Sequence, residues 1–230
     1  MNNNINFIDI LASTLHDTKN SLGLLSNTLA KIIESCQEKD SSLSQDFNLL
    51  QYEIKRLNHN QIRLLALYKA EKSQFSVNVD YHSVSECLED VAIQSEPFLA
   101  SKGIEIELDC PETLFWAFDR SLIGGILDNV LNNALRYTKE KVRISAGEVN
   151  GYLILSVYDN GAGYPASMLV NGEDDILLKE SVDFNTGSTM LGLYFAKLVA
   201  GLHVNKERQG YIALSNGGQL GGGTFALYLP

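Results

Sequence analysis

Apolar residues recur at alternating steps of three and four in two stretches of the chain, residues 11–36 and 47–68. Such spacing is typical of helices that pack along a single seam. The polar stretch 38–46 separates the two, which predicts a helical hairpin. A two-helix hairpin leaves apolar surface uncovered, so two copies are expected to associate into a homodimeric four-helix bundle. The seam positions are Leu11, Leu15, Thr18, Leu22, Leu25, Leu29, Ile32 and Cys36 in the first helix and Phe47, Leu50, Ile54, Leu57, Gln61, Leu64 and Tyr68 in the second.

The distribution of glycine divides the chain. No glycine occurs between Gly23 and Gly103, whereas the rest is rich in glycine and alternates helix-like with strand-like runs. The change predicts a boundary near residues 73–78, with a helical domain in 1–75 and an α/β sandwich in 76–230. The strands expected in the second domain are 104–109, 114–119, 142–149, 152–159, 211–216 and 224–230, and the expected helices are 83–103, one beginning under an Asp119 cap, and one within 187–202.

The formal net charge of the chain is −10. An acidic surface repels a nucleic-acid backbone, so no nucleic-acid partner is expected. Cys36, Cys87 and Cys110 are odd in number and widely spaced, which predicts no disulfide framework or metal knuckle and favours the reducing cytoplasm. No apolar run is long enough to span a membrane and no signal-peptide pattern occurs, so we expect a cytoplasmic chain without a membrane segment.

His16 lies one residue past the seam position Leu15. A helix turns by about 100° per residue, so the ring is expected on the surface, where a neutral imidazole is an available nucleophile. Asp17 can accept a proton from it, and Asn20, four residues on, shares its face. For His16 taken alone, a solvated polar residue is the alternative. The other histidines lack such a neighbourhood: His59 on the second helix, His82 in a loop and His203 after a helix.

Polar side chains line one flank of the helix expected after Asp119. Asn129 and Asn133 stand four residues apart on this flank, and Arg136 and Tyr137 extend it. Two amides, a guanidinium and a phenol can contact phosphate and supply an oxygen ligand to Mg²⁺. The alternative is a solvated helix face, because asparagine is common on such surfaces.

The apolar strand 152–159 ends at Asp159 and runs directly into Gly161 and Gly163. Asn-Gly after a strand is typical of a hairpin, but here a long polar stretch follows instead of a partner strand. We therefore expect a loop that covers a ligand. A carboxylate at a strand end, with glycines that let the backbone approach, can accept a hydrogen bond from the exocyclic amine of a purine.

Five motifs, taken in order, resemble the cytoplasmic core of bacterial sensor histidine kinases over essentially the whole chain. HDTKN (16–20) resembles the phosphoacceptor box of that family, DNVLNNALRYT (128–138) the asparagine box and DNGAG (159–163) the first glycine box. TMLGLYFAKLV (189–199) resembles the second glycine box, and GGGTFALYLP (221–230) resembles the terminal strand.

The resemblance implies a dimeric hairpin that carries the phosphorylated histidine, followed by an ATP-binding α/β sandwich shared with gyrase-type ATPases. His16 would attack the γ-phosphate of ATP, with Asp17 as its base. The phosphoryl group would pass to an aspartate in the receiver domain of a response regulator. Asn20 would orient water when that partner is dephosphorylated.

The same resemblance assigns the nucleotide site. Asn129 would bind Mg²⁺, and Asp159 would read the adenine amine. The other positions would contact phosphate or ribose, hinge the loop over the nucleotide or complete the pocket: Asn133, Arg136, Tyr137, Gly161, Gly163, Gly192 and Thr224.

Departures from the family pattern keep other hypotheses open. Ser188 and Met190 stand where the family has glycines. In the segment 164–189 several acidic residues accompany a single basic residue, Lys179. A histidine phosphotransferase, whose nucleotide domain no longer uses ATP, would fit these departures. A dimeric scaffold without chemistry is a third class. The input signal would come from a sensor partner or from another part of a longer protein.

Overall fold

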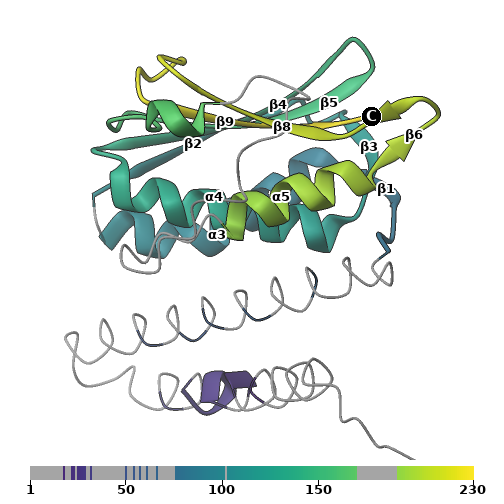
Figure 1. Cartoon of the computed structure of the whole chain (residues 1–230). Helices are drawn as coiled ribbons and strands as arrows, with labels where there is room; N and C mark the ends of the chain where they lie inside the picture. Colours follow the sequence, from purple (N-terminus) through teal and green to yellow (C-terminus); the bar gives the residue numbers. More distant parts are fainter. Residues whose placement is uncertain are drawn as a thin grey trace, which may run out of the picture. The chain divides into compact units, whose positions relative to one another are not determined.

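Figure 1 shows the computed structural model of the chain, which describes residues 76–101, 103–169 and 191–230 and isolated positions between Thr18 and Ala66. The chain divides into two compact units, residues 1–75 and 76–230.

In the first unit the described positions from Thr18 onward are helical. Successive seam positions differ in exposure, since Leu22 and Leu29 are buried whereas Leu25 and Ile32 are exposed. The predicted hairpin as a whole lies outside the described residues. Two further exposed seam residues are Leu50 and Leu57.

The second unit is built on a five-stranded mixed sheet in the order β2-β4-β5-β9-β8. β2 and β4 are parallel, and each of the other neighbouring pairs is antiparallel. In the central strand β5 the alternate residues Leu153, Leu155 and Val157 are buried, which defines the core face of the sheet. The strands are β2 (Glu105–Asp109), β4 (Lys141–Val149), β5 (Tyr152–Asp159), β8 (Tyr211–Asn216) and β9 (Gly223–Leu229).

Helices cover one face of this sheet, as Figure 1 shows. They are α3 (Val84–Ser101), α4 (Arg120–Tyr137) and α5 (Leu191–Leu202). The core between the two layers is fully apolar at its centre, where Leu127, Ile144 and Phe225 have no exposed surface. The predicted α/β domain is therefore confirmed as a mixed sheet with helices on one face. None of the described helices is long and apolar enough to cross a membrane.

The helix α4 begins and packs as its sequence predicts. Asp119 is the N-cap, and its Oδ1 accepts a hydrogen bond from Leu122 N at 3.0 Å. Burial of each large apolar side chain contributes roughly 1.5 to 3 kcal/mol, so the apolar face fixes the rotation of the helix on the sheet. The buried residues of that face are Ile123, Ile126, Leu127, Val130, Leu131 and Ala134.

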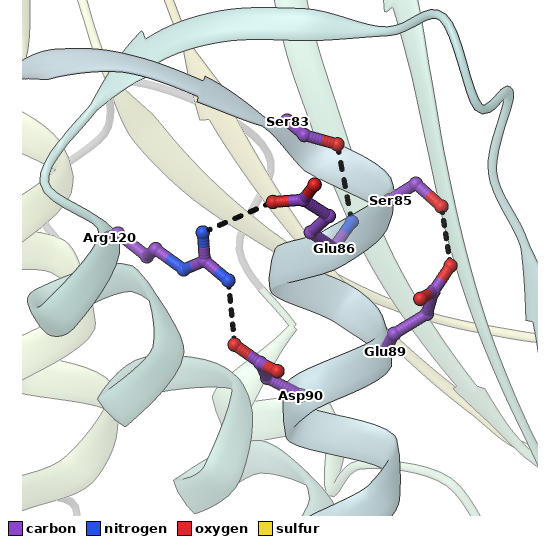
Figure 2. A network of polar contacts seen from close by, with 6 residues as sticks. All are labelled: Ser83, Ser85, Glu86, Glu89, Asp90 and Arg120. Atoms are coloured by element: carbon purple, nitrogen blue, oxygen red, sulfur yellow. Dashed lines mark hydrogen bonds and ion pairs between the residues drawn. The ribbon is translucent and has the colours of Figure 1, made fainter.

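Polar side chains join the first two turns of α3 to the first turn of α4, as Figure 2 shows. The Arg120 guanidinium donates a hydrogen bond to Asp90 at 2.6 Å and lies 3.6 Å from a Glu86 carboxylate oxygen. Ser83 Oγ accepts a hydrogen bond from Glu86 N at 3.3 Å, which caps the start of α3. The ion pairs are partly exposed and contribute little stability, but they orient the first turn of α4 against α3.

Two short ribbons complete the second unit. β1 (Asp80–Ser83) pairs with β3 (Phe115–Phe118), and β6 (Val204–Asn205) pairs with β7 (Arg208–Gln209). The expectation that His82 lies in a loop is wrong, because it lies in β1 with its ring edge-on to Phe118 at 5.4 Å. A four-residue strand directly before a helix is too short for its alternation to be recognised.

Candidate nucleotide site

Asp159 ends β5, and backbone amides from two turns hold its carboxylate. Oδ1 accepts hydrogen bonds from Gly161 N at 2.7 Å and from Gly223 N at 3.1 Å. The Asp159 carbonyl accepts another from Gly222 N at 3.0 Å. Within the described residues, Oδ2 accepts none. One carboxylate oxygen is therefore fixed in place, and the other keeps its full capacity as an acceptor.

Glycines let the backbone close around this carboxylate. A Cβ on Gly222 would lie 2.4 Å from Asp159 Oδ1, and a Cβ on Gly223 would lie 2.7 Å from Oδ2. A Cβ on Gly161 would lie 2.2 Å from the Tyr137 carbonyl oxygen, at the end of α4. Close approach, rather than backbone conformation, therefore requires glycine at these positions.

Asn160 fixes the same corner from its other side. Its Oδ1 accepts hydrogen bonds from the backbone amides of Lys139 at 3.1 Å, Glu140 at 3.1 Å and Lys141 at 3.2 Å. These amides lie between the end of α4 and the start of β4. The residue next to Asp159 thus ties the loop after α4 to the loop after β5.

Tyr164 forms a wall beside the Asp159 carboxylate. Its ring atoms lie 3.0 and 3.2 Å from the position that a Gly223 Cβ would occupy, next to Asp159 Oδ2. Burial raises the pKa of the Tyr164 phenol, and the Asp159 charge raises it further. The phenol is therefore neutral at physiological pH.

A side-chain amide clamps the backbone of Tyr164. Asn216 Oδ1 accepts a hydrogen bond from Tyr164 N at 2.7 Å, and Asn216 Nδ2 donates one to Tyr164 O at 2.8 Å. Gly163, the last residue of the DNGAG motif and the residue before Tyr164, has φ of 80°, and a Cβ there would meet the Asn216 side chain at 2.6 Å. Glycine at this position therefore serves both the turn and the clamp.

Asn129 marks a second part of the site, on α4. Its side chain is buried, and Nδ2 has no hydrogen-bond partner among the residues that the structure describes. A Cβ on Gly192, in the first turn of α5, would lie 2.2 Å from that Nδ2. A buried amide without a partner costs about 1 to 3 kcal/mol, which marks Asn129 as a group in need of a ligand.

The other residues of the predicted α4 flank differ from Asn129. Asn133 and Tyr137 are exposed. The side chain of Arg136 lies outside the described residues. The structure therefore brings Asn129 together with Gly192, and Asp159 together with Gly161, while Asn133 and Tyr137 project their side chains to solvent.

Thr224 stands apart from the Asp159 carboxylate. It pairs with Tyr158 across β5 and β9, and side chains alternate along a strand, so Thr224 and Asp159 project from opposite faces of the sheet. Its hydroxyl is buried without a partner in the part of the chain that the structure describes, and a Cβ on Gly218 would lie 2.2 Å from Oγ1. Thr224 therefore packs beneath the turn that joins β8 to β9.

The predicted catalytic residues His16, Asp17 and Asn20 lie outside the described residues, as does the segment 170–190 with Ser188 and Met190. Among the residues that the structure describes, no three His, Cys, Asp or Glu side chains form a metal-binding group.

Sequence reasoning missed Tyr164 and Asn216 as parts of the site. Tyr164 directly follows the DNGAG motif, and Asn216 is the last residue of β8, so only their positions next to glycine turns were available as a signal. Their hydrogen bonds join residues 52 positions apart, which no local pattern indicates.

Comparison with known proteins found a family match for most of the second unit and relatives similar to nearly the whole chain. Residues 118–230 match the family described as histidine kinase-, DNA gyrase B-, and HSP90-like ATPase. The sensor protein SrrB of Staphylococcus aureus is 24% identical over 226 residues, which cover 96% of this chain. The chain spans 38% of the length of SrrB.

Solved structures show the same architecture. The histidine kinase AdeS of Acinetobacter baumannii is 26% identical, with a TM-score of 0.57 over 93% of this chain and 96% of that one. Full-length ShkA in complex with AMPPNP is 20% identical, with a TM-score of 0.62 over 96% of this chain and 45% of that one. The ShkA likeness concerns the fold.

Proposed function

We propose that the chain autophosphorylates His16 from Mg-ATP. The chain is similar to sensor histidine kinases, and its residues 118–230 match the family of histidine kinase-, DNA gyrase B-, and HSP90-like ATPases. The phosphoryl group then passes to an aspartate of a response-regulator receiver domain. The observation that carries the proposal is the Asp159 carboxylate, with Oδ1 fixed by two amides and Oδ2 left as an acceptor.

Asp159 and Tyr164 suit the base of ATP. Oδ2 can accept a hydrogen bond from the exocyclic amine of adenine, whereas guanine offers a carbonyl at the same place and would be repelled. The neutral Tyr164 ring beside it offers an apolar wall to the base. ShkA, which shares the fold, was solved with AMPPNP, an analogue of ATP.

Asn129 suits the phosphate end of the nucleotide. A half-turn of its amide exchanges nitrogen and oxygen, so it can donate to a phosphate or offer an oxygen to Mg²⁺. Mg²⁺ commonly takes only one or two protein ligands beside phosphate and water, and would neutralise charge on the phosphates. Asn133, Arg136 and Tyr137 further along α4 would contact phosphate or ribose, with Gly161, Gly163 and Gly192 giving room for the backbone.

The transfer itself forms one bond and breaks one. A ring nitrogen of His16 attacks the γ-phosphorus, the bond to the bridging oxygen breaks, and ADP leaves with that oxygen. Asp17 takes the proton of the imidazole. Asn20 would orient water for dephosphorylation of the partner.

We also infer a homodimer, from the exposed seam residues of the first unit. Exposed leucines on a seam cost free energy in water, and a second copy can cover them. The exposed side chains that support this are Leu25, Ile32, Leu50 and Leu57. We expect the chain to act in the cytoplasm, where response regulators are found.

Labelling tests the proposal. Incubation with γ-labelled ATP and Mg²⁺ should give acid-labile label in the wild-type chain, and His16→Gln should abolish it. His59→Gln is the matched control and should keep the label. Absence of label together with no AMPPNP binding at millimolar concentration would contradict the proposal. Label that arrives only from a phosphorylated receiver domain would instead support the phosphotransferase, which the Asp159 geometry does not favour.

A further inference from the structure

Asp119 joins three segments that are far apart in the sequence. Oδ1 caps α4, and Oδ2 accepts a hydrogen bond from Asn78 N at 2.8 Å. The Asp119 amide donates to His203 Nε2 at 3.0 Å. Asn78 belongs to residues 76–79, by which the chain leaves the first unit and begins the second, and His203 directly follows α5. One residue thus links the start of the unit to two helices.

His203 extends this connection into α5. Its ring is 3% exposed, and Nδ1 donates to Val199 O at 2.8 Å while Nε2 accepts from Asp119. The ring is therefore a neutral imidazole with its proton on Nδ1. Both partners of the ring are backbone groups, which the sequence interpretation of His203 as a residue after a helix did not indicate. Asp119 is 8% exposed, so water competes little for these hydrogen bonds.

The linked helices are those that form the candidate site. α4 carries Asn129, and the carbonyl of its last residue, Tyr137, lies against Gly161. α5 carries Gly192, which lies against Asn129. Arg120, the residue after Asp119, ties the same first turn to α3 (Figure 2). The link to residues 76–79 reaches α4 at its N-cap and α5 just after its last residue, whereas Asn129 lies further along α4 and Gly192 lies at the opposite end of α5.

We propose that Asp119 and His203 are positioning residues, which fix the segment 76–79 to α4 and α5 and so hold the nucleotide-bearing unit for transfer to the histidine. The proposal rests on the proposed kinase function. In the described part of the chain, no hydrogen bond of either residue reaches Asp159 or Asn129. The pair should therefore affect the rate of transfer and not the affinity for nucleotide.

Two variants remove the hydrogen bond between Asn78 N and Asp119 Oδ2, one by changing the acceptor and the other by changing the donor. Asp119→Asn keeps an oxygen for the helix cap but turns an amide donor toward Asn78 N, which can no longer be bonded. Asn78→Pro removes that amide proton and leaves Asp119, the cap and His203 in place. Asn78→Ala is the matched control because it keeps the backbone donor.

The experiment measures amide exchange, nucleotide affinity and labelling rate on the full chain. Exchange at Asn78 should be faster in Asp119→Asn than in wild type. At saturating Mg-ATP both variants should label about tenfold more slowly or worse, because a small misplacement of reacting groups is costly, with an unchanged Kd for AMPPNP. The double variant should be no slower than either single one, since both remove one hydrogen bond. Asn78→Ala should match wild type.

The outcomes separate the two levels of the proposal. A wild-type chain that takes no label overturns the proposed function, and this inference with it. A labelled wild type with equally fast variants overturns the inference alone. Equal losses of rate and affinity, or unchanged exchange at Asn78, also overturn it, because the pair would then act inside the site or not at all.

Discussion

The two ends of the proposed nucleotide site are built on opposite principles. At the base end, Asp159 accepts two backbone amides and Asn216 clamps Tyr164 with two further hydrogen bonds. At the phosphate end, the Asn129 amide is buried with Nδ2 unpaired. The first end is fixed by hydrogen bonds, whereas the second holds a buried donor that has no partner in the described part of the chain.

This difference predicts which substitutions should lower both stability and activity and which should lower activity alone. A hydrogen bond to a charged acceptor contributes about 1.5 to 3 kcal/mol, so loss of Asp159 should harm the fold and the function together. An unpaired buried donor costs about 1 to 3 kcal/mol, so loss of Asn129 should harm the function alone.

Asn129→Ala gives the largest expected effect. Removal of a group that binds the reacting phosphate should slow labelling by about 10² to 10³. The free energy of unfolding, measured in urea, should stay the same or rise, because an unpaired buried amide disappears. Asn133→Ala is the control at an exposed position of the same helix and should leave stability within about 0.5 kcal/mol. Marked destabilisation by Asn129→Ala would remove the contrast between the two ends.

Asp159→Asn and Asp159→Ala separate the role of Asp159 Oδ1 in stability from the role of Oδ2 in binding. Asparagine keeps an acceptor for Gly161 and Gly223, so its unfolding free energy should stay close to wild type. Its other atom donates and cannot accept the adenine amine, which predicts AMPPNP binding about 10- to 100-fold weaker by calorimetry. Alanine should lose both affinity and stability. Undiminished affinity in Asp159→Asn would show that Oδ2 does not bind the base.

Gly192→Ala tests the phosphate end through packing. Its methyl group would overlap the Asn129 amide, which predicts destabilisation of about 1 to 3 kcal/mol. Gly125→Ala, in α4, is the matched control, because a Cβ there meets nothing within 4 Å. That variant should gain up to about 1 kcal/mol from helix propensity. Equal effects of the two substitutions on chemical denaturation would count against the close contact.

Tyr164→Phe should give the smallest effect, and only at high pH. The folded-state pKa of Tyr164 is raised by burial and by Asp159, so its contribution to stability is fully present below the unfolded pKa of about 10. That contribution is lost as the pH rises from there toward the folded value. Wild type and variant should therefore diverge in unfolding free energy between pH 9 and pH 11, with wild type losing more. Parallel curves would indicate an exposed phenol.

Local sequence signals account for the layers of the second unit. The Asp119 cap and the apolar face of α4 were both predictable, because capping and helical periodicity act within a few residues. The end of β5 at Asp159 was predictable for the same reason, since an apolar strand stops at a polar residue followed by glycine.

Contacts across the fold were not predictable in this way. His203 bonds to an amide 84 positions away, and Asn216 bonds to Tyr164 across 52 positions. The separation of Thr224 from Asp159 depends on strand register, which the sequence of either strand alone does not fix. The two-residue strands β6 and β7 are too short to show any alternation.

The three hydrogen bonds to Asn160 Oδ1 limit where this chain can accept inserted residues. The loop between α4 and β4 is short and exposed, the kind of place where proteins usually accept inserted residues. Here three successive amides of that loop share one side-chain oxygen. An insertion would release Asn160 and, through the peptide bond, its neighbour Asp159. Relatives that lengthen this loop should therefore carry a different anchor for the carboxylate.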